Sequence, residues 1–192
     1  MTETNFAFGS DSSDSGKFIA MVMGENVDVV KLHKEVCTRH SLKRIHMRRI
    51  IERAEVARTL GSLITPYVHM FCFYIDRSQH SKTLDSSPKT KYLSRVQKNQ
   101  HIDYCIMEEI LLSISSSLRN FRQNWGNISV QADSDTEKMF RASGRAIVPP
   151  DCAYELADAV AWANRANNAP SRVKEIDIRA RIGKQLRKWT NP

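Results

Sequence analysis

The sequence predicts an α/β domain with elements in the order βββαβαβα: a mixed five-stranded sheet flanked by helices, then a basic C-terminal helix. Two short β-forming stretches, residues 4–10 and 17–23, are separated by a turn rich in Ser, Asp and Gly. Residues 68–75 are apolar at successive positions, which is typical of a strand buried on both faces. Apolar residues recur at helical spacing in the segments around that strand, so helices and strands are expected to alternate.

The first half of the chain is expected to hold three antiparallel strands and one long helix. Residues 24–26 carry a second turn signal, and residues 27–32 are expected to form the third strand. Ser41 occupies the position of a helix N-cap, and apolar residues at helical spacing predict one helix from there to about residue 64. Pro66 ends this helix before the central strand.

The stretch after the central strand is polar. Residues 77–100, rich in Ser, Lys and Gln, are expected to form a loop or an insertion. Apolar residues at every fourth position from Ile102 predict a second helix that ends at residues 125–127. Residues 128–132 predict a short strand, and residues 133–150 a loop.

Two helices are expected at the C-terminal end. Asp151 is placed to cap a helix that runs to about residue 166, and its many small side chains favour close packing on the sheet. After Pro170, a basic amphipathic helix is expected at residues 172–189. Its apolar face carries Ile178, Ile182, Leu186 and Trp189. We therefore expect one domain at residues 1–168, with an insertion at about 77–100, and a separate helix within residues 169–192.

Four carboxylates are the candidate functional residues. Asp11 follows the first strand, and Asp76 ends the central strand. Glu55 lies near the buried stripe of the first helix, and Asp158 lies among alanines on the last helix of the domain. A carboxylate in such a place is costly unless it is paired or binds a cation. Bound divalent cations would relieve the repulsion between several converging acids.

Each acid also has a plainer interpretation. Asp11 could be a turn residue, and Asp76 could cap a loop. Glu55 could pair with Arg58, and Asp158 with Arg165. Five further acids are alternatives to these ligands: Glu52 is a rival of Glu55, Asp151 and Glu155 are rivals of Asp158, and either Asp133 or Asp135 could substitute as a ligand.

Each of the four acids stands in a motif that resembles one of the ribonuclease H-like superfamily, in the same order. Asp11 stands in Ser-Asp-Ser-Ser, which resembles Thr-Asp-Gly-Ser of the first strand. Glu55 stands in Arg-Ala-Glu-Val-Ala, which resembles the first-helix motif. Asp76 stands in Ile-Asp-Arg-Ser-Gln, which resembles the Thr-Asp-Ser-Gln that ends the fourth strand. Asp158 stands in Ala-Asp-Ala-Val-Ala, which resembles Ala-Asp-x-x-Ala of the last helix. The resemblance covers about residues 4–166 and extends to small archaeal proteins of this superfamily.

The resemblance implies a metal-dependent nuclease that hydrolyses phosphodiester bonds in RNA, an RNA–DNA hybrid or structured nucleic acid. It implies two Mg²⁺ or Mn²⁺ ions, about 3.5–4 Å apart, held by the four acids. The chain departs from the family pattern at Ser12, where the motif has Gly, and in residues 133–150, which contain no His. A catalytically weak or inactive module that binds nucleic acid or a protein is the alternative.

Composition favours a polyanionic partner. The chain has 29 Lys+Arg against 21 Asp+Glu, a net charge of +8. Such an excess favours binding to phosphates, because counterions are released. The expected contacts to nucleic acid lie on the terminal helix: Arg179, Arg181, Lys184, Arg187 and Lys188. That helix could instead dock on the domain or on a protein partner.

Localisation is expected to be cytoplasmic. The four cysteines form no Cys-x-x-Cys pair, and neither a signal peptide nor a membrane-spanning run is expected.

Overall fold

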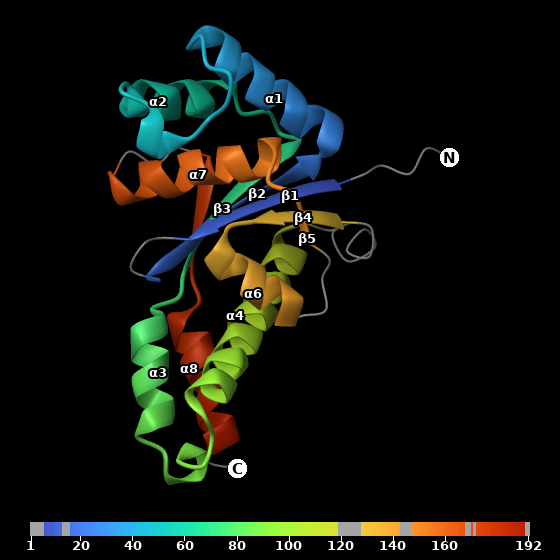
Figure 1. Cartoon of the computed structure of the whole chain (residues 1–192). Helices are drawn as coiled ribbons and strands as arrows, with labels where there is room; N and C mark the ends of the chain where they lie inside the picture. The colour runs from blue at the N-terminus through green and yellow to red at the C-terminus, as the bar shows by residue number, and fades with distance from the viewer. Residues whose placement is uncertain are drawn as a thin grey trace.

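The computed structural model describes residues 6–12, 16–118, 128–142, 147–167, 170 and 172–190. It is an α/β fold built on a mixed six-stranded sheet in the order β5-β4-β1-β2-β3-β6 (Figure 1). The strands are β1 (Phe6–Ser12), β2 (Phe18–Glu25), β3 (Val68–Tyr74), β4 (Ile128–Ala132), β5 (Ile147–Val148) and β6 (Val173–Asp177). In this part of the chain, no helix is long and apolar enough to cross a membrane.

Both pairing modes occur in the sheet. β1, β2 and β3 form consecutive antiparallel pairs, so β1 and β3 run in the same direction. β4 pairs parallel with β1, and β5 pairs parallel with β4. β6 pairs parallel with β3 at the other edge. The carboxyl ends of β1 and β4 therefore meet at the same end of the sheet.

Helices cover both faces of the sheet (Figure 1). On one face lie α1 (Asn26–Arg39), α2 (Arg53–Leu63) and α7 (Cys152–Arg165), which form a core with Ala20, Val22 and Met70. On the other face lie α4 (Arg95–Ser117), α6 (Ser134–Ala142) and α8 (Arg179–Thr190), with α3 (Arg77–Asp85) beside α4 and α8. Short 3-10 turns occur at Met47–Arg49 and Pro88–Thr90.

The expected third strand at residues 27–32 is wrong, because this segment belongs to α1. Val29, Leu32 and Val36 are buried at three- and four-residue spacing, which is the helical period. The expected helix from Ser41 to residue 64 is also wrong in its first half. Ile45 and Met47 are both buried, two residues apart, in a segment whose one regular element is the 3-10 turn at Met47–Arg49, and the α-helix begins only at Arg53.

Two expected loops contain regular structure. Residues 77–100 hold α3, a 3-10 turn and the start of α4, which begins with a capping box between Ser94 and Gln97. Residues 133–150 hold α6 and β5. α3 was hidden in the sequence because it buries only His80 and Leu84, and the rest of its surface is polar. The helix expected to run from Ile102 to residues 125–127 corresponds to α4, which ends earlier, at Ser117, while residues 125–127 lie outside the described residues.

The strands expected near 4–10, 17–23, 68–75 and 128–132 are present as β1, β2, β3 and β4. The helix expected after Asp151 is present as α7, and Asp151 occupies its N-cap position without a side-chain cap hydrogen bond. The C-terminal segment differs from the expectation, because residues 173–177 form β6 and only residues from 179 onward are helical. Ile178, Ile182 and Leu186 are fully buried in the core on the α4 side. The last segment therefore extends both the sheet and the core.

Candidate active site

Asp11 and Asp133 lie side by side at the carboxyl ends of two parallel strands. The β1–β4 register pairs Ser10 with Ala132, so the next residues along, Asp11 and Asp133, stand level with each other. The hydroxyl of Ser12 donates to Asp133 Oδ2 at 3.0 Å. Two adjacent strands thus fix the positions of both carboxylates.

α7, which packs on one face of the sheet, contributes a third acid, Asp158. It crosses β1 so closely that a Cβ at Gly9 would overlap the backbone of Ala153. The Gln131 side chain on β4 accepts hydrogen bonds from the N–H groups of Asp151 and Tyr154 at 3.0 and 3.1 Å. These contacts fix the start of α7, from which Asp158 reaches the same cleft as Asp11 and Asp133.

This cleft has a volume of about 690 Å³, and both acidic and basic side chains line it. Asp11, Asp133, Asp158 and the half-buried Tyr154 lie along it. The cationic and aromatic part of its lining consists of Arg44, His46, Arg48, Arg53, Trp162 and Arg165. The cleft therefore presents carboxylates to a cation and guanidinium groups to an anion.

The electrostatics at Asp11 show how closely the acids are placed. Asp11 is only 8% exposed. Its burial, with the negative charges of Asp133 and Asp158, raises the pKa of its carboxyl from 3.8 to about 8, against smaller opposing effects from the Ser12 backbone and Arg165. Burial, together with the same three acids, also raises the pKa of Tyr154 to about 12. A nearby positive charge would relieve the repulsion that adds to the effect of burial in both shifts.

Asp133 and Asp158 are held by protein donors. Asp133 Oδ1 accepts from the N–H and the hydroxyl of Thr136 at 2.8 and 2.5 Å. Asp158 Oδ2 accepts from the N–H of Met47 at 2.9 Å and lies 3.4 Å from His46 Nδ1. Asp158 therefore faces the cleft while it also anchors the segment that precedes α2.

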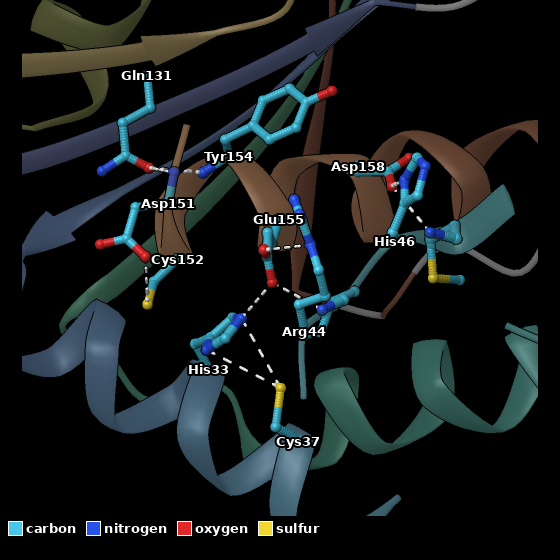
Figure 2. A network of polar contacts seen from close by, with 12 residues as sticks. His33, Cys37, Arg44, His46, Gln131, Asp151, Cys152, Tyr154, Glu155 and Asp158 are labelled. Atoms are coloured by element: carbon cyan, nitrogen blue, oxygen red, sulfur yellow. Dashed lines mark hydrogen bonds and ion pairs between the residues drawn. The ribbon is translucent and has the colours of Figure 1, made fainter. Parts of the chain in front are cut away.

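Glu155, a second acid of α7, binds the same segment before α2 on its side away from the cleft, next to α1 (Figure 2). Glu155 Oε2 accepts from Ile45 N–H at 2.7 Å and contacts His33 Nε2 at 2.7 Å, and Glu155 Oε1 lies 3.1 Å from Arg44 Nε. Burial alone would raise the pKa of Glu155, but the hydrogen bonds from His33 and Ile45 outweigh it and hold this pKa below its usual value. Residues 44–48 are thus attached to α7 at two points one turn apart.

The structure does not bring Glu55 and Asp76 into the cleft. Glu55 is exposed on α2 and lies 3.4 Å from Arg58, so it makes the ion pair that was the alternative to a ligand role. Asp76 caps α3 and accepts from the Ser78 hydroxyl and the Gln79 N–H at 2.8 and 3.2 Å. These bonds, chiefly the one from Ser78, lower the pKa of Asp76. β1 and β3 are not neighbours in the sheet: β2 lies between them, and this alone separates them by about 10 Å.

The basic side chains expected to bind nucleic acid lie on α8, on the face of the sheet opposite α7 (Figure 1). Arg179 contacts Asp177, and Arg181 contacts Glu109, at 2.5 and 3.2 Å. The remaining three are exposed: Lys184, Arg187 and Lys188.

From the sequence, Asp133 was named only as a substitute ligand, and neither Tyr154 nor the arginines of residues 44–53 were named as site residues. A correct count of the strands would have pointed to Asp133. Because residues 27–32 are helical, β3 is the third strand and β4 the fourth, so Asp133 is the acid at the end of the fourth strand.

The donor set of the cleft suits a hard divalent cation, which prefers carboxylate oxygens. In the described ranges, no three His, Cys, Asp or Glu side chains already stand at the spacing that would hold a metal ion. A cation shared by Asp11, Asp133 and Asp158 would therefore require their side chains to turn toward one another. Comparisons with protein-family models, curated proteins and solved structures found no match.

Proposed function

We propose that the chain is a divalent-cation-dependent phosphodiesterase of the ribonuclease H-like type that acts on nucleic acid. The observation that carries this proposal is the meeting of Asp11, Asp133 and Asp158, from β1, β4 and α7, in one cleft lined by arginines. Asp133 takes the role that the sequence had given to Asp76, and Glu55 is left out.

The sheet order supports the ribonuclease H-like assignment. That superfamily was expected from three antiparallel strands followed by alternating helices and strands. β1, β2 and β3 are antiparallel, and β4 and β5 follow on the other side of β1. The resemblance also assigns one acid to the end of the fourth strand, which is the position of Asp133. α1, α2, α3, β6 and α8 are additions to that order.

The acids of the cleft are suited to holding Mg²⁺ or Mn²⁺. Asp11 is buried beside two other carboxylates, so a bound cation would stabilise its charged form. When bound, such a cation neutralises phosphate charge and makes a water molecule more acidic.

The other side chains of the cleft would orient the substrate. Arg44, Arg48 and Arg165 place positive charge where the phosphodiester would lie, and guanidinium groups match phosphate oxygens. The phenol of Tyr154 stays protonated at neutral pH because its pKa is about 12, so it can donate a hydrogen bond to a phosphate oxygen.

The test is hydrolysis of bis(4-nitrophenyl) phosphate and of labelled RNA, hybrid and duplex DNA, with Mg²⁺, Mn²⁺ or EDTA. We expect cation-dependent cleavage that falls at least about a hundredfold in Asp133→Asn. Asp76→Asn is the matched control, because it removes the same charge from the end of β3, and it should keep its activity.

Melting temperatures of both variants would show that they are folded. Equal activity of wild type and Asp133→Asn would overturn the assigned site, and equal losses in the two variants would do the same. Salt-dependent binding of nucleic acid without cleavage under any cation would point to the non-catalytic module instead.

A further inference from the structure

A second cavity adjoins the cleft. It has a volume of about 580 Å³ and lies between α7 and the segment that leads into α2. Arg48, Arg53 and Trp162 line both this outer cavity and the cleft. The two hollows therefore form one path, in which Trp162 stands between the acids and the outer end.

α7 provides one wall of this path through side chains at helical spacing. Tyr154, Asp158, Trp162 and Arg165 follow one another at intervals of four, four and three residues, and all four line the cleft. Residues at such intervals share one face of a helix, and four residues rise about 6 Å. Trp162 is half-buried, so part of its indole ring is accessible one turn beyond Asp158.

Arginines provide the opposite wall. Arg49 joins Arg48 and Arg53 at the outer cavity, and Arg48 and Arg49 are exposed. Arg53 donates to the carbonyl oxygens of Ile50 and Arg48, which fixes its guanidinium group at the entrance of α2. Glu52 and Glu55 line the cavity as well, but Glu55 contacts Arg58. The cationic groups of this wall outnumber the acids.

We propose that the outer cavity binds the nucleotide next to the reacting phosphodiester of a single-stranded polynucleotide, with its base stacked on Trp162 and its phosphate against the arginines. This inference rests on the proposed function for the phosphodiester at the acids, and it adds the strand preference. An aromatic platform beside a cationic groove is how proteins bind single strands, since every base has a face that can stack.

A duplex fits this arrangement poorly. Its bases are stacked on one another and paired, and stacking on a protein ring requires a base that is splayed out. Trp162 is partly buried and packed against the core, so a base must leave the strand to stack on the part of it that stays accessible. The path thus favours single strands, loops and frayed ends over continuous duplexes.

The test is binding, measured by fluorescence anisotropy in EDTA, where no cleavage occurs. The ligands are end-labelled twelve-nucleotide poly(dT) and poly(U), and a duplex of the same length. We expect the wild type to bind the single strands at least about tenfold more tightly than the duplex. Trp162→Ala should weaken single-strand binding about 5- to 150-fold, the range for loss of one stacked base.

Three variants make the outcome decisive. Trp162→Phe should restore most of the binding, because a phenyl ring still stacks. Trp189→Ala, which removes the indole at the end of α8, should bind as the wild type does. Arg49→Ala should weaken binding to all sequences and reduce the slope of log K against log salt concentration by about 1. Arg49 is exposed, so this variant tests the arginine wall even if Trp162→Ala fails to fold.

Equal affinity for single strands and duplex would overturn the inference. So would unchanged binding in Trp162→Ala or Arg49→Ala, or a loss of binding in Trp189→Ala. Failure of the proposed function gives a different result, namely no cation-dependent hydrolysis of bis(4-nitrophenyl) phosphate, RNA, hybrid or duplex DNA by the wild type.

Discussion

At the scale of single residues, the candidate site depends on the close backbone contact at Gly9 and on the buried carboxyl of Asp11. Gly9 lets α7 lie directly on β1, because its missing side chain leaves room for the Ala153 carbonyl group. Two residues further along the same strand, Asp11 faces α7 and carries a carboxyl that is costly to ionise. The contact between β1 and α7 brings the acids together. Because ionisation of the buried Asp11 costs free energy, we expect a cation to bind beside it.

Gly9→Ala should destabilise the protein by more than about 3 kcal/mol, since backbone must move to admit the methyl group. The matched control is Gly183→Ala in α8, where a Cβ would meet only Arg187 Nη1 at 3.5 Å. There alanine should stabilise the helix by about 0.5–1 kcal/mol. Urea denaturation measures both changes, and similar effects from the two substitutions would contradict the role given to Gly9.

The raised pKa of Asp11, about 8, predicts a pH dependence of stability in EDTA. The folded protein keeps a proton that the unfolded chain releases near its ordinary pKa of 3.8. The contribution of this carboxyl is therefore fully present below pH 3.8 and is lost as the pH rises to about 8. We expect Asp11→Asn to be more stable than wild type at pH 8 by at least about 1 kcal/mol. Parallel stability profiles of the two proteins between pH 5 and pH 8 would rule this out.

At the scale of elements, α7 organises the site. Its face toward the cleft carries Asp158 and Trp162, while Glu155 holds His33 of α1 and the backbone of Ile45 (Figure 2). One helix therefore positions both an acid and the arginine-bearing segment opposite it. Loss of the attachment at Glu155 should loosen that segment before it affects the sheet.

Glu155→Gln should destabilise the protein by about 2–4 kcal/mol at pH 7, because it leaves His33 and Arg44 without their carboxylate. The lowered pKa of Glu155 means that its contribution is present above its ordinary pKa of 4.5 and is lost as the pH falls. The variant should therefore lose less stability than wild type on acidification. Hydrogen exchange at Ile45 should also become faster.

The control for this prediction is Glu35→Gln, which removes an exposed pair with Arg39. Such surface pairs contribute at most about 0.5 kcal/mol, so this variant should match the wild type. If the two Gln variants had equal stability, Glu155 would not be the attachment point.

Elements with a clear local pattern could be predicted from the sequence. β3 is apolar except for His69, and α7 combines a capping position with small residues. β6 could not be predicted, because three of its five residues are charged, as suits an edge strand. α1 begins with β-branched residues, and this opening resembled a strand. That single error shifted the strand count and moved the third acid from Asp133 to Asp76. Spatial neighbours such as Tyr154 and Arg48 depend on packing that no local pattern records.

At the scale of the whole molecule, positive charge lies on both faces of the sheet but has different surroundings. The arginines of residues 44–53 border the acids of the cleft. On α8, Arg179 and Arg181 are paired with acids, and the helix packs against α3 and α4 (Figure 1). The C-terminal segment therefore has a structural role whether or not its exposed lysines meet a polyanion.

This structural role predicts that a chain ending at Asn167 will not fold cooperatively. The truncation leaves β3 with an open edge and removes Ile178, Ile182 and Leu186 from the core on the α4 side. Burial of each such side chain contributes about 1.5–3 kcal/mol, so the loss approaches the whole stability of a typical domain. Circular dichroism and thermal melting of the purified fragment would measure this. A fragment that melts cooperatively near the temperature of the full chain would mean that residues 1–167 form a complete domain, as the sequence first suggested.

A subtler variant is Ile182→Ala, which keeps β6 in place. It should lower the free energy of unfolding by about 2–5 kcal/mol if α8 belongs to the core.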